Sequence, residues 1–335
     1  MTETAGASGR QHALGVDGVV ELATLERNGL AESRHLGAAV TVSPNGDVIE
    51  SHGDVEALVY PRSSLKPMQA LAVMRSGVTL DGAQLVLASA SHSGTPAHLA
   101  VVSQLLERAG LTEDALQCPL DWPGDAQSAA VTRTSGEKHR VMMNCSGKHA
   151  AFLLACVENG WPIESYLDPA HPLQVRIRET IEEFTGEPVG HVGVDGCGAP
   201  LFAVSLRALA RVFSLVARGR NPNGDDADVA RLAAAIQEYP WAIDGPGRAN
   251  TVVIEELGLL CKGGAEGVIA MGAADGTAVA MKSLDGSHRI TSLVALDLLA
   301  RAGAIAPGDA ARVAALVTEQ VLGGGVPVGH IRVAF

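Results

Sequence analysis

The stretch GAAVTVSPNGDVIESHG, residues 37–53, decides the fold. Its two apolar runs, AVTV and VI, flank the dipeptide Asn45-Gly46, which is the strongest short turn signal between strands. We therefore predict a β-hairpin here. A second turn dipeptide, Asn28-Gly29, precedes it and marks further extended chain on the N-terminal side.

Strand signals return in the last quarter of the chain. Residues 268–271 and 277–281 are apolar runs separated by the turn dipeptide Asp275-Gly276, and a helix is expected over 290–302. Apolar residues between the two ends recur at helical spacing. The expected helices are 65–75, 96–109, 149–158, 172–185, 201–218, 226–238 and 250–257, with a surface loop at 219–226.

We therefore predict an α/β protein of the α+β type, in which N- and C-terminal strands form one antiparallel sheet and a large helical portion packs on and beside it. Residues 1–15 form a polar stretch of small residues, which we expect to be a flexible tail. No internal repeat or Pro/Gly-rich linker divides the rest. Residues 16–335 are expected to form a single catalytic domain with a sheet half and a helical half.

Composition excludes several classes of protein. The 335 residues carry 37 acidic and 25 basic side chains, a net charge of −12, and only 3% aromatic residues, which argues against nucleic-acid binding. A hydrophobic fraction of 47% argues against disorder and predicts an aliphatic core. No apolar run is long enough to cross a membrane, and the start lacks a signal-peptide pattern. We expect a cytoplasmic location.

The five cysteines are too few and too scattered for a disulfide framework. They are odd in number, and no two are closer than eleven positions, which also excludes a CxxC zinc knuckle. The thiols are therefore expected to be reduced.

The first candidate for catalysis is the tetrapeptide Ser63-Ser64-Leu65-Lys66. At a helix start, S-x-x-K spacing places the hydroxyl of Ser63 and the amine of Lys66 on one face. A lysine kept neutral by burial can take the proton of a serine, and N-terminal N–H groups favour the negative charge that develops. The alternative is a serine that caps the helix beside a solvated lysine.

Two later segments strengthen the catalytic interpretation. Serine β-lactamases and penicillin-binding proteins follow S-x-x-K with an S-x-N element and a K-[ST]-G strand. Here Ser91-His92-Ser93 and Lys262-Gly263-Gly264 occur in that order. The match is imperfect, because Ser93 replaces Asn and Gly263 replaces the hydroxyl residue.

A third segment, Asn144-Cys145-Ser146-Gly147-Lys148-His149, resembles the end of a P-loop but is not one. Met142 stands at the position of the leading glycine, and His149 replaces the magnesium-binding hydroxyl residue. Cys145 lies at an expected helix start, and Cys197 lies on another glycine-rich turn. The two thiols could meet around a metal ion, or they could be inert buried side chains.

Taken together, six motifs resemble the Rhizobium-type L-asparaginases, the asparaginase II family, from about Val20 to the C-terminus. The motifs are RSSLKP (62–67), ASHSG (90–94), NCSGKH (144–149), DGC (195–197), GRxxT (247–251) and CKGGAEG (261–267). The resemblance implies hydrolysis of L-asparagine to L-aspartate and ammonia, in a fold similar to that of serine β-lactamases and glutaminases.

The resemblance also assigns roles to individual residues. It implies two Ser-Lys tandems, Ser63 with Lys66 and Ser91 with Lys262, and Ser63 would be the nucleophile. It implies a zinc ion and a homodimer. The zinc ligands would be Cys145, Lys148 and Cys197, and the substrate pocket would contain Arg62, His149 and Asp195. In that pocket the arginine would suit an α-carboxylate and the aspartate an α-ammonium group.

Two departures and two alternatives accompany this assignment. Thr95 stands where many relatives have Glu, and Asn250 where some have Cys, so that substrate preference could differ. S-x-x-K order alone would also permit a serine esterase or peptide amidohydrolase. A non-catalytic protein that binds zinc or an amino acid is the other alternative. In every case we expect a small-molecule ligand, with neither nucleic acid nor membrane as a partner.

Overall fold

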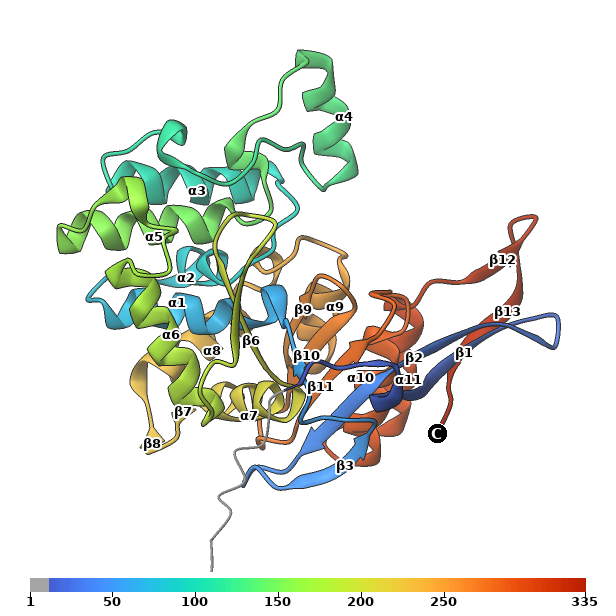
Figure 1. Ribbon diagram of the computed structural model, residues 1–335. Helices are drawn as coiled ribbons and strands as arrows, with labels where there is room; N and C mark the ends of the chain where they lie inside the picture. The colour runs from blue at the N-terminus through green and yellow to red at the C-terminus, as the bar shows by residue number, and fades with distance from the viewer. Residues whose placement is uncertain (1–11) are drawn as a thin grey trace, which may run out of the picture.

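The computed structural model describes residues 12–335, apart from the side chain of Ser135, and its centre is an eight-stranded antiparallel sheet (Figure 1). The strand order is β12-β13-β1-β2-β11-β10-β9, and β3 pairs with the far end of β2. The strands are β1 (Val20–Arg27), β2 (Leu30–Val42), β3 (Val48–His52), β9 (Leu260–Gly264), β10 (Val268–Gly272), β11 (Ala278–Ser283), β12 (Val321–Gly323) and β13 (Val326–Val333).

The predicted hairpin is present as β2 and β3, joined by the turn that contains Asn45-Gly46. The strand β2 also pairs with β11, in the register Val40↔Ala280, and this pairing joins the two ends of the chain into one sheet. The register requires glycine at Gly37, because a Cβ atom there would lie 2.2 Å from the carbonyl oxygen of Lys282. The predicted fold class, an antiparallel sheet from terminal strands with a large helical portion, is confirmed.

Helices cover both faces of the central strands. The helix α7 (Leu206–Ala217) packs on β2, β10 and β11, while α10 (Thr291–Arg301) packs on β10 and β11 from the other side (Figure 1). Every residue of β10 is buried, as expected for a strand covered on both faces. Beyond α10 lies α11 (Pro307–Val317), which also contacts α9 (Ala249–Leu257).

The other helices form the portion beside the sheet. They are α1 (Lys66–Arg75), α2 (Gly82–Ala88), α3 (Pro96–Arg108), α4 (Ala126–Ser135), α5 (Ser146–Asn159), α6 (Pro172–Thr185) and α8 (Ala227–Glu238). The first eleven residues of α5 are all buried, because α1, α2 and α3 surround this helix. The helix α4 projects from the body (Figure 1). Short 3₁₀ helices lie at Val16–Gly18, Arg62–Leu65, Glu113–Ala115, Arg140–Met142, Ile163–Ser165 and Pro240–Ala242.

One predicted helix is wrong at its start. The apolar segment expected to be helical from residue 201 begins as a strand, β6 (Pro200–Ser205), which pairs with β4 (Leu58–Val59) and β5 (His191–Val194). The helix α7 begins only after Ser205, whose hydroxyl caps it by accepting a hydrogen bond from the N–H of Ala208. The expected loop at 219–226 contains a small hairpin, β7 (Arg220–Asn221) and β8 (Gly224–Asp225).

The predicted tail lies mainly outside the described residues, which begin at His12. Within the described part, Ala13 forms a parallel bridge with Leu58, and the His12 ring contacts Asp54 at 2.6 Å. Among the described helices, none is both long and apolar enough to cross a bilayer.

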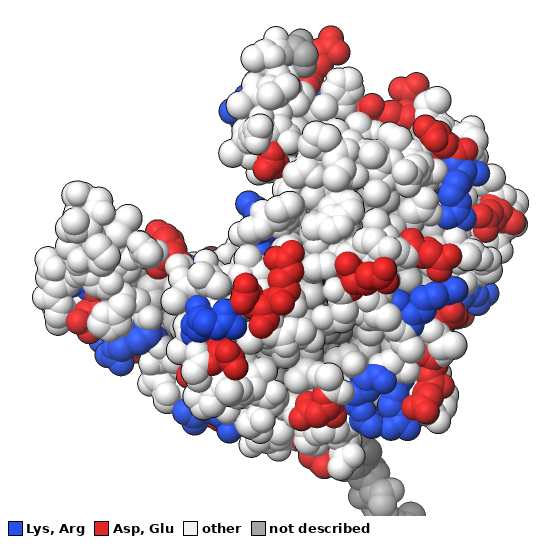
Figure 2. Space-filling view, turned by 180° about the vertical axis from the view of Figure 1, so that it is seen from behind, with Lys and Arg blue, Asp and Glu red and all other residues white. Residues whose placement is uncertain are grey.

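The surface carries charges of both signs, and the stability of the fold comes mainly from the core. On the face in Figure 2, acidic and basic side chains lie next to one another in several groups, with uncharged surface between them. Exposed ion pairs contribute about 0–1 kcal/mol each. The core is aliphatic, as composition predicts, since Ala, Val and Leu dominate the buried residues.

Candidate active site

The proposed nucleophile lies on a tight turn where the helical portion meets the sheet. Residues Arg62–Leu65 form a 3₁₀ turn that leads into α1 at Lys66. Arg62 has a φ of 53°, the left-handed region that side chains other than glycine rarely adopt, and such backbone strain is common at functional sites. The turn presents Ser63, which is partly exposed.

Neither serine caps α1, contrary to the alternative drawn from the sequence. The residue before the helix is Leu65, which makes no side-chain cap. The hydroxyl of Ser64 is completely buried and donates a hydrogen bond to the carbonyl oxygen of Lys262, at 2.9 Å. Ser64 therefore fastens the turn to the edge strand β9, and β9 carries the second lysine of the candidate site.

The amines of Lys66 and Lys262 meet at a single hydroxyl. Ser91 Oγ lies 3.1 Å from Lys66 Nζ and 2.9 Å from Lys262 Nζ. Both lysine side chains are 1% exposed. Within the described part of the chain, the Ser63 hydroxyl makes no hydrogen bond, so the structure pairs Lys66 with Ser91 rather than with Ser63. Residues three apart in a 3₁₀ turn eclipse each other, which keeps Ser63 on the side of Lys66.

The environment of Lys262 favours a neutral amine. Burial and the nearby Lys66 amine lower the pKa of Lys262 to about 7, against an ordinary value of 10.5. Near neutral pH a substantial fraction of Lys262 can therefore accept a proton. Its contact with Ser91 gives that proton a route.

Two thiols extend this cluster toward the start of α5. Cys145 Sγ lies 3.0 Å from Lys66 Nζ, and Cys197 Sγ lies 3.1 Å from Lys148 Nζ. The interaction with Cys145, with help from Lys148 and His149, lowers the pKa of the Cys197 thiol, whereas the same contact and burial raise the pKa of Cys145. These opposite shifts favour a thiolate at Cys197 and a neutral thiol at Cys145, and the nearby Cys197 raises the pKa of Lys148 against the effect of its burial.

The chemistry of these donors fits a zinc ion. No three His, Cys, Asp or Glu side chains gather as a metal site among residues 12–335, and the set here consists of two thiols and one amine. Zinc prefers thiolate sulfur and neutral nitrogen, and it displaces protons from its ligands when it binds. Cys145, Lys148 and Cys197 would supply two sulfurs and one nitrogen at one buried point.

His149 is buried beside Cys197 and does not line the open pocket beside Arg62. Its side chain is completely buried, Nδ1 lies 2.7 Å from Tyr166 Oη, and Nε2 has no hydrogen-bond partner in the described structure. Burial lowers its pKa. We therefore group His149 with the neighbours of Cys197, and its role in substrate binding stays a prediction.

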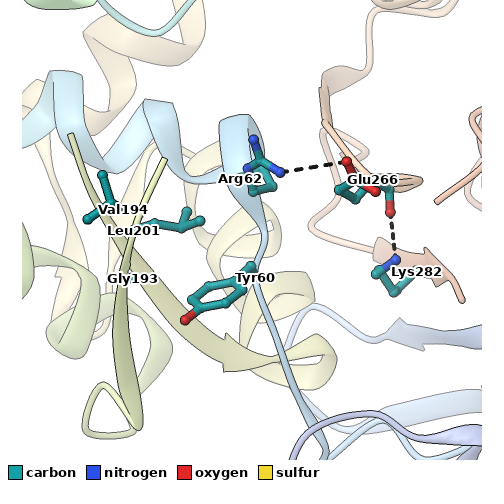
Figure 3. Close-up of a pocket in the computed structure, with 7 residues that line it drawn as sticks. All are labelled: Tyr60, Arg62, Gly193, Val194, Leu201, Glu266 and Lys282. Atoms are coloured by element: carbon teal, nitrogen blue, oxygen red, sulfur yellow. Dashed lines mark hydrogen bonds and ion pairs between the residues drawn. The ribbon is translucent and has the colours of Figure 1, made fainter. Parts of the chain in front are cut away.

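Arg62 and Asp195, predicted to bind the two charges of an amino acid, bind each other. Arg62 Nε lies 2.7 Å from Asp195 Oδ1, and Arg62 Nη1 lies 4.0 Å from Glu266 Oε1. The arginine faces an open pocket of about 440 Å³, shown in Figure 3. The residues that line it are Tyr60, Arg62, Gly193, Val194, Leu201, Glu266 and Lys282.

Sequence analysis missed the residues that hold this cluster together. His92 is 1% exposed, its Nδ1 accepts the N–H of Gly94, and its Nε2 lies 2.9 Å from Ser146 Oγ. The ring thus joins the Ser91 segment to the start of α5. The position of His92 between two serines in the ASHSG motif could have indicated this role.

Comparison with known proteins gives one match over nearly the whole chain. A family model described as L-asparaginase II matches residues 23–333. No curated protein sequence matches the chain.

Solved structures match more distantly. A structure titled Mglu in its native form is 13% identical with a TM-score of 0.47, and the match covers 80% of this chain and 64% of that one. A Bacillus glutaminase is 11% identical with a TM-score of 0.39, covering 80% and 91%. A β-lactamase from Mycobacterium bovis is 19% identical with a TM-score of 0.41, covering 83% and 94%. Because every one of these TM-scores is below 0.5, the assignment to a family rests on the family model.

Proposed function

Because the chain belongs to the L-asparaginase II family, we propose that it hydrolyses the side-chain amide of L-asparagine to L-aspartate and ammonia. The single observation that supports this chemistry best is the hydroxyl of Ser91, which lies 3.1 Å from the amine of Lys66 and 2.9 Å from that of Lys262. This arrangement offers a route for protons between a nucleophile and a buried neutral base.

In the first half of the proposed reaction, Ser63 attacks the amide carbon. Its proton passes to Lys66, while Lys66 gives a proton to Ser91 and Ser91 gives its own to neutral Lys262. One neutral amine is thus shared between two lysines. The carbon–nitrogen bond then breaks, a proton returns along the same route to the leaving nitrogen, and ammonia departs. Backbone N–H groups near Ser63 would stabilise the oxyanion, each contributing about 10²–10³ in rate.

In the second half, water takes the position that ammonia has left. It attacks the β-aspartyl ester, gives a proton to the same chain, and Ser63 recovers its proton as L-aspartate leaves. In both halves the 3₁₀ turn holds Ser63 at the N-terminal end of α1.

The charged ends of the substrate have matching groups beside the nucleophile. Arg62 suits the α-carboxylate and Asp195 the α-ammonium group. In the free protein the two side chains neutralise each other at 2.7 Å, so the substrate exchanges one ion pair for two. The pocket in Figure 3 leaves room beside Arg62 for this exchange.

The first test is ammonia release from L-asparagine and L-glutamine by the purified protein. We expect asparagine to be hydrolysed with a kcat/KM at least about tenfold higher than that for glutamine, because one extra methylene displaces the amide from a fixed nucleophile. Stable acylation of Ser63 by a penicillin-type probe without ammonia release would instead favour a serine esterase or peptide amidohydrolase. Zinc binding without any hydrolysis would favour a binding protein.

We also propose that Cys145, Lys148 and Cys197 hold a zinc ion. A bound ion would keep both thiols as thiolates and fix the start of α5. The variant Cys197→Ala is expected to weaken zinc binding by at least about 100-fold, because one of two sulfur ligands is lost. Metal analysis after dialysis and calorimetric titration measure this directly. Cys156→Ala removes a buried thiol of α5 outside the set and should retain zinc; equal zinc binding by both variants would contradict the site.

A further inference from the structure

Two polar side chains outside the proposed catalytic set join the segments that carry Ser91 and Lys262. Asn250, in the first turn of α9, accepts a hydrogen bond from the backbone N–H of Gly263 at 2.9 Å and donates one to Asp244 Oδ2 at 2.9 Å. A Cβ atom on Gly263 would lie 3.2 Å from Asn250 Oδ1, so the amide lies against the strand next to Lys262.

The loop that carries Asp244 is hydrogen-bonded to the Ser91 segment. The backbone N–H of Ser91 donates to the carbonyl oxygen of Ile243 at 3.0 Å. Gly245 has a φ of 129°, and a Cβ atom there would lie 2.2 Å from Ser93 Oγ, so this loop packs directly on the Ser91 segment. Asp244 thus lies on a loop that is bonded to Ser91, and it accepts a hydrogen bond from Asn250, which is bonded to β9.

We propose that Asp244 and Asn250 are positioning residues that set the orientation of the Lys262 amine toward the Ser91 hydroxyl. The inference rests on the proposed function, since it concerns the proton route of that reaction. The amine of Lys262 donates to Ser91 Oγ at 2.9 Å and to the carbonyl oxygen of Gly263 at 2.8 Å. Asn250 holds the same Gly263 by its N–H, so a shift of this residue would move an acceptor of the amine.

Asp244 also acts on the charge of Lys262. The charged and titratable groups near enough to act on the pKa of this amine are Lys66 on α1, Cys145 before α5, Cys261 on β9 and Asp244 on its loop. Asp244 is the carboxylate among them, and it raises the pKa of Lys262 against the opposite effects of burial and Lys66. Its second oxygen lies 3.5 Å from Arg248 Nε, and its side chain is 13% exposed. Asp244 therefore keeps the titration of Lys262 near neutral pH instead of further below it.

The test uses Asp244→Asn, Asn250→Ala and the matched control Asn159→Ala. Asn159 also makes two hydrogen bonds through its amide, to Ser76 and Ala155, but it lies at the far end of α5. The titration of Lys262 is followed by NMR of protein labelled in its lysine side chains, with the resonance identified by its loss in Lys262→Met. Asp244→Asn is expected to lower the midpoint by about 0.5–1 pH unit.

The kinetic readout separates positioning from folding. Asn250→Ala is expected to lower kcat for asparagine about 10–100-fold with KM changed by less than about twofold, because the proton route is disturbed and the substrate contacts are kept. Asn159→Ala should leave both constants, and the Lys262 midpoint, as in the wild type.

An unchanged Lys262 midpoint in Asp244→Asn would overturn the role of Asp244, and equal kcat losses in Asn250→Ala and Asn159→Ala would overturn that of Asn250. If the wild type hydrolyses no asparagine, the proposed function fails. The NMR titration needs no substrate and still decides whether Asp244 tunes Lys262. The result for Asp244→Asn does not depend on whether Asn250→Ala folds.

Discussion

Ser63→Ala is expected to lower asparagine turnover by at least about 10³-fold without loss of stability. The hydroxyl is the only group lost, and it makes no hydrogen bond in the described part of the structure, so its removal costs the fold little. Ammonia release under single-turnover conditions measures the loss. The melting temperature should stay within about 2 °C of the wild type.

Two neighbouring serines make this prediction specific. Ser64 is completely buried and bonded to Lys262, so Ser64→Ala should lower activity far less than Ser63→Ala but should destabilise the protein by about 1–2 kcal/mol. Ser76, whose hydroxyl donates to Ala72 at the other end of α1, is the distant control. If Ser64→Ala were the inactive variant and Ser63→Ala active, the assignment of the nucleophile would have to be abandoned.

The parts of the fold that could be read from sequence are those set by local chemistry. The Asn45-Gly46 turn predicts the β2–β3 hairpin because few other residues accept its backbone angles. The helix α3 starts as expected, since Thr95 accepts the N–H of His98 and Pro96 follows in the first turn. Even the pairing of terminal strands follows, because both ends offer strands that need a partner.

The wrong prediction of a helix at residues 201–205 has a physical cause. All six residues of β6 are buried, and an apolar run without alternation has neither the period of a strand nor that of a helix. Its identity is decided by its partners, β4 and β5, which are only two and four residues long and carry little pattern of their own. The helix α7 is strongly amphipathic, so its pattern was extended backward into the strand.

The candidate site was predictable as a set of residues but not as a set of contacts. The family resemblance implied a pairing of Ser91 with Lys262, and Lys262 Nζ lies 2.9 Å from Ser91 Oγ. The motifs could not show that Lys66 also contacts Ser91 and Cys145, because these contacts join segments that are far apart in the sequence. Nor could they show that the free protein pairs Arg62 with Asp195, since both had been assigned to substrate.

Three buried lysines lie close together in this acidic protein. The chain has a net charge of −12, yet three lysines, Lys66, Lys148 and Lys262, are each 1% exposed in one cluster. Burying three like charges together is costly unless some are neutralised. The lowered pKa of Cys197 favours a thiolate beside Lys148, and the lowered pKa of Lys262 reduces the charge of this second amine near neutral pH. The third lysine, Lys66, contacts Ser91 and Cys145.

Lys262→Met is therefore expected to lower kcat by at least about 10²–10³-fold while the protein remains folded. Methionine has a similar length and no charge, so the buried space is filled and the proton acceptor is lost. In the wild type, kcat should rise with pH through about 7, as Lys262 loses its proton. In Lys262→Met the residual rate should lack this limb. A pH profile of ammonia release from both proteins checks the assignment.

The pH dependence of the stability of Lys262→Met tests the lowered pKa of Lys262 independently of activity. The pKa of Lys262 is about 7 in the folded protein and 10.5 in the unfolded chain, so between these values the unfolded chain binds more protons. Burying the charged amine of Lys262 destabilises the wild type, and this cost is largest below pH 7. The wild type should therefore become more stable as pH rises from 7 to 10.5. Lys262→Met carries no such penalty, so its melting temperature relative to the wild type should be highest near pH 6 and should fall toward pH 10. A difference that does not change with pH would show that Lys262 titrates normally, and the neutral amine on which the proposed proton route depends would be lost.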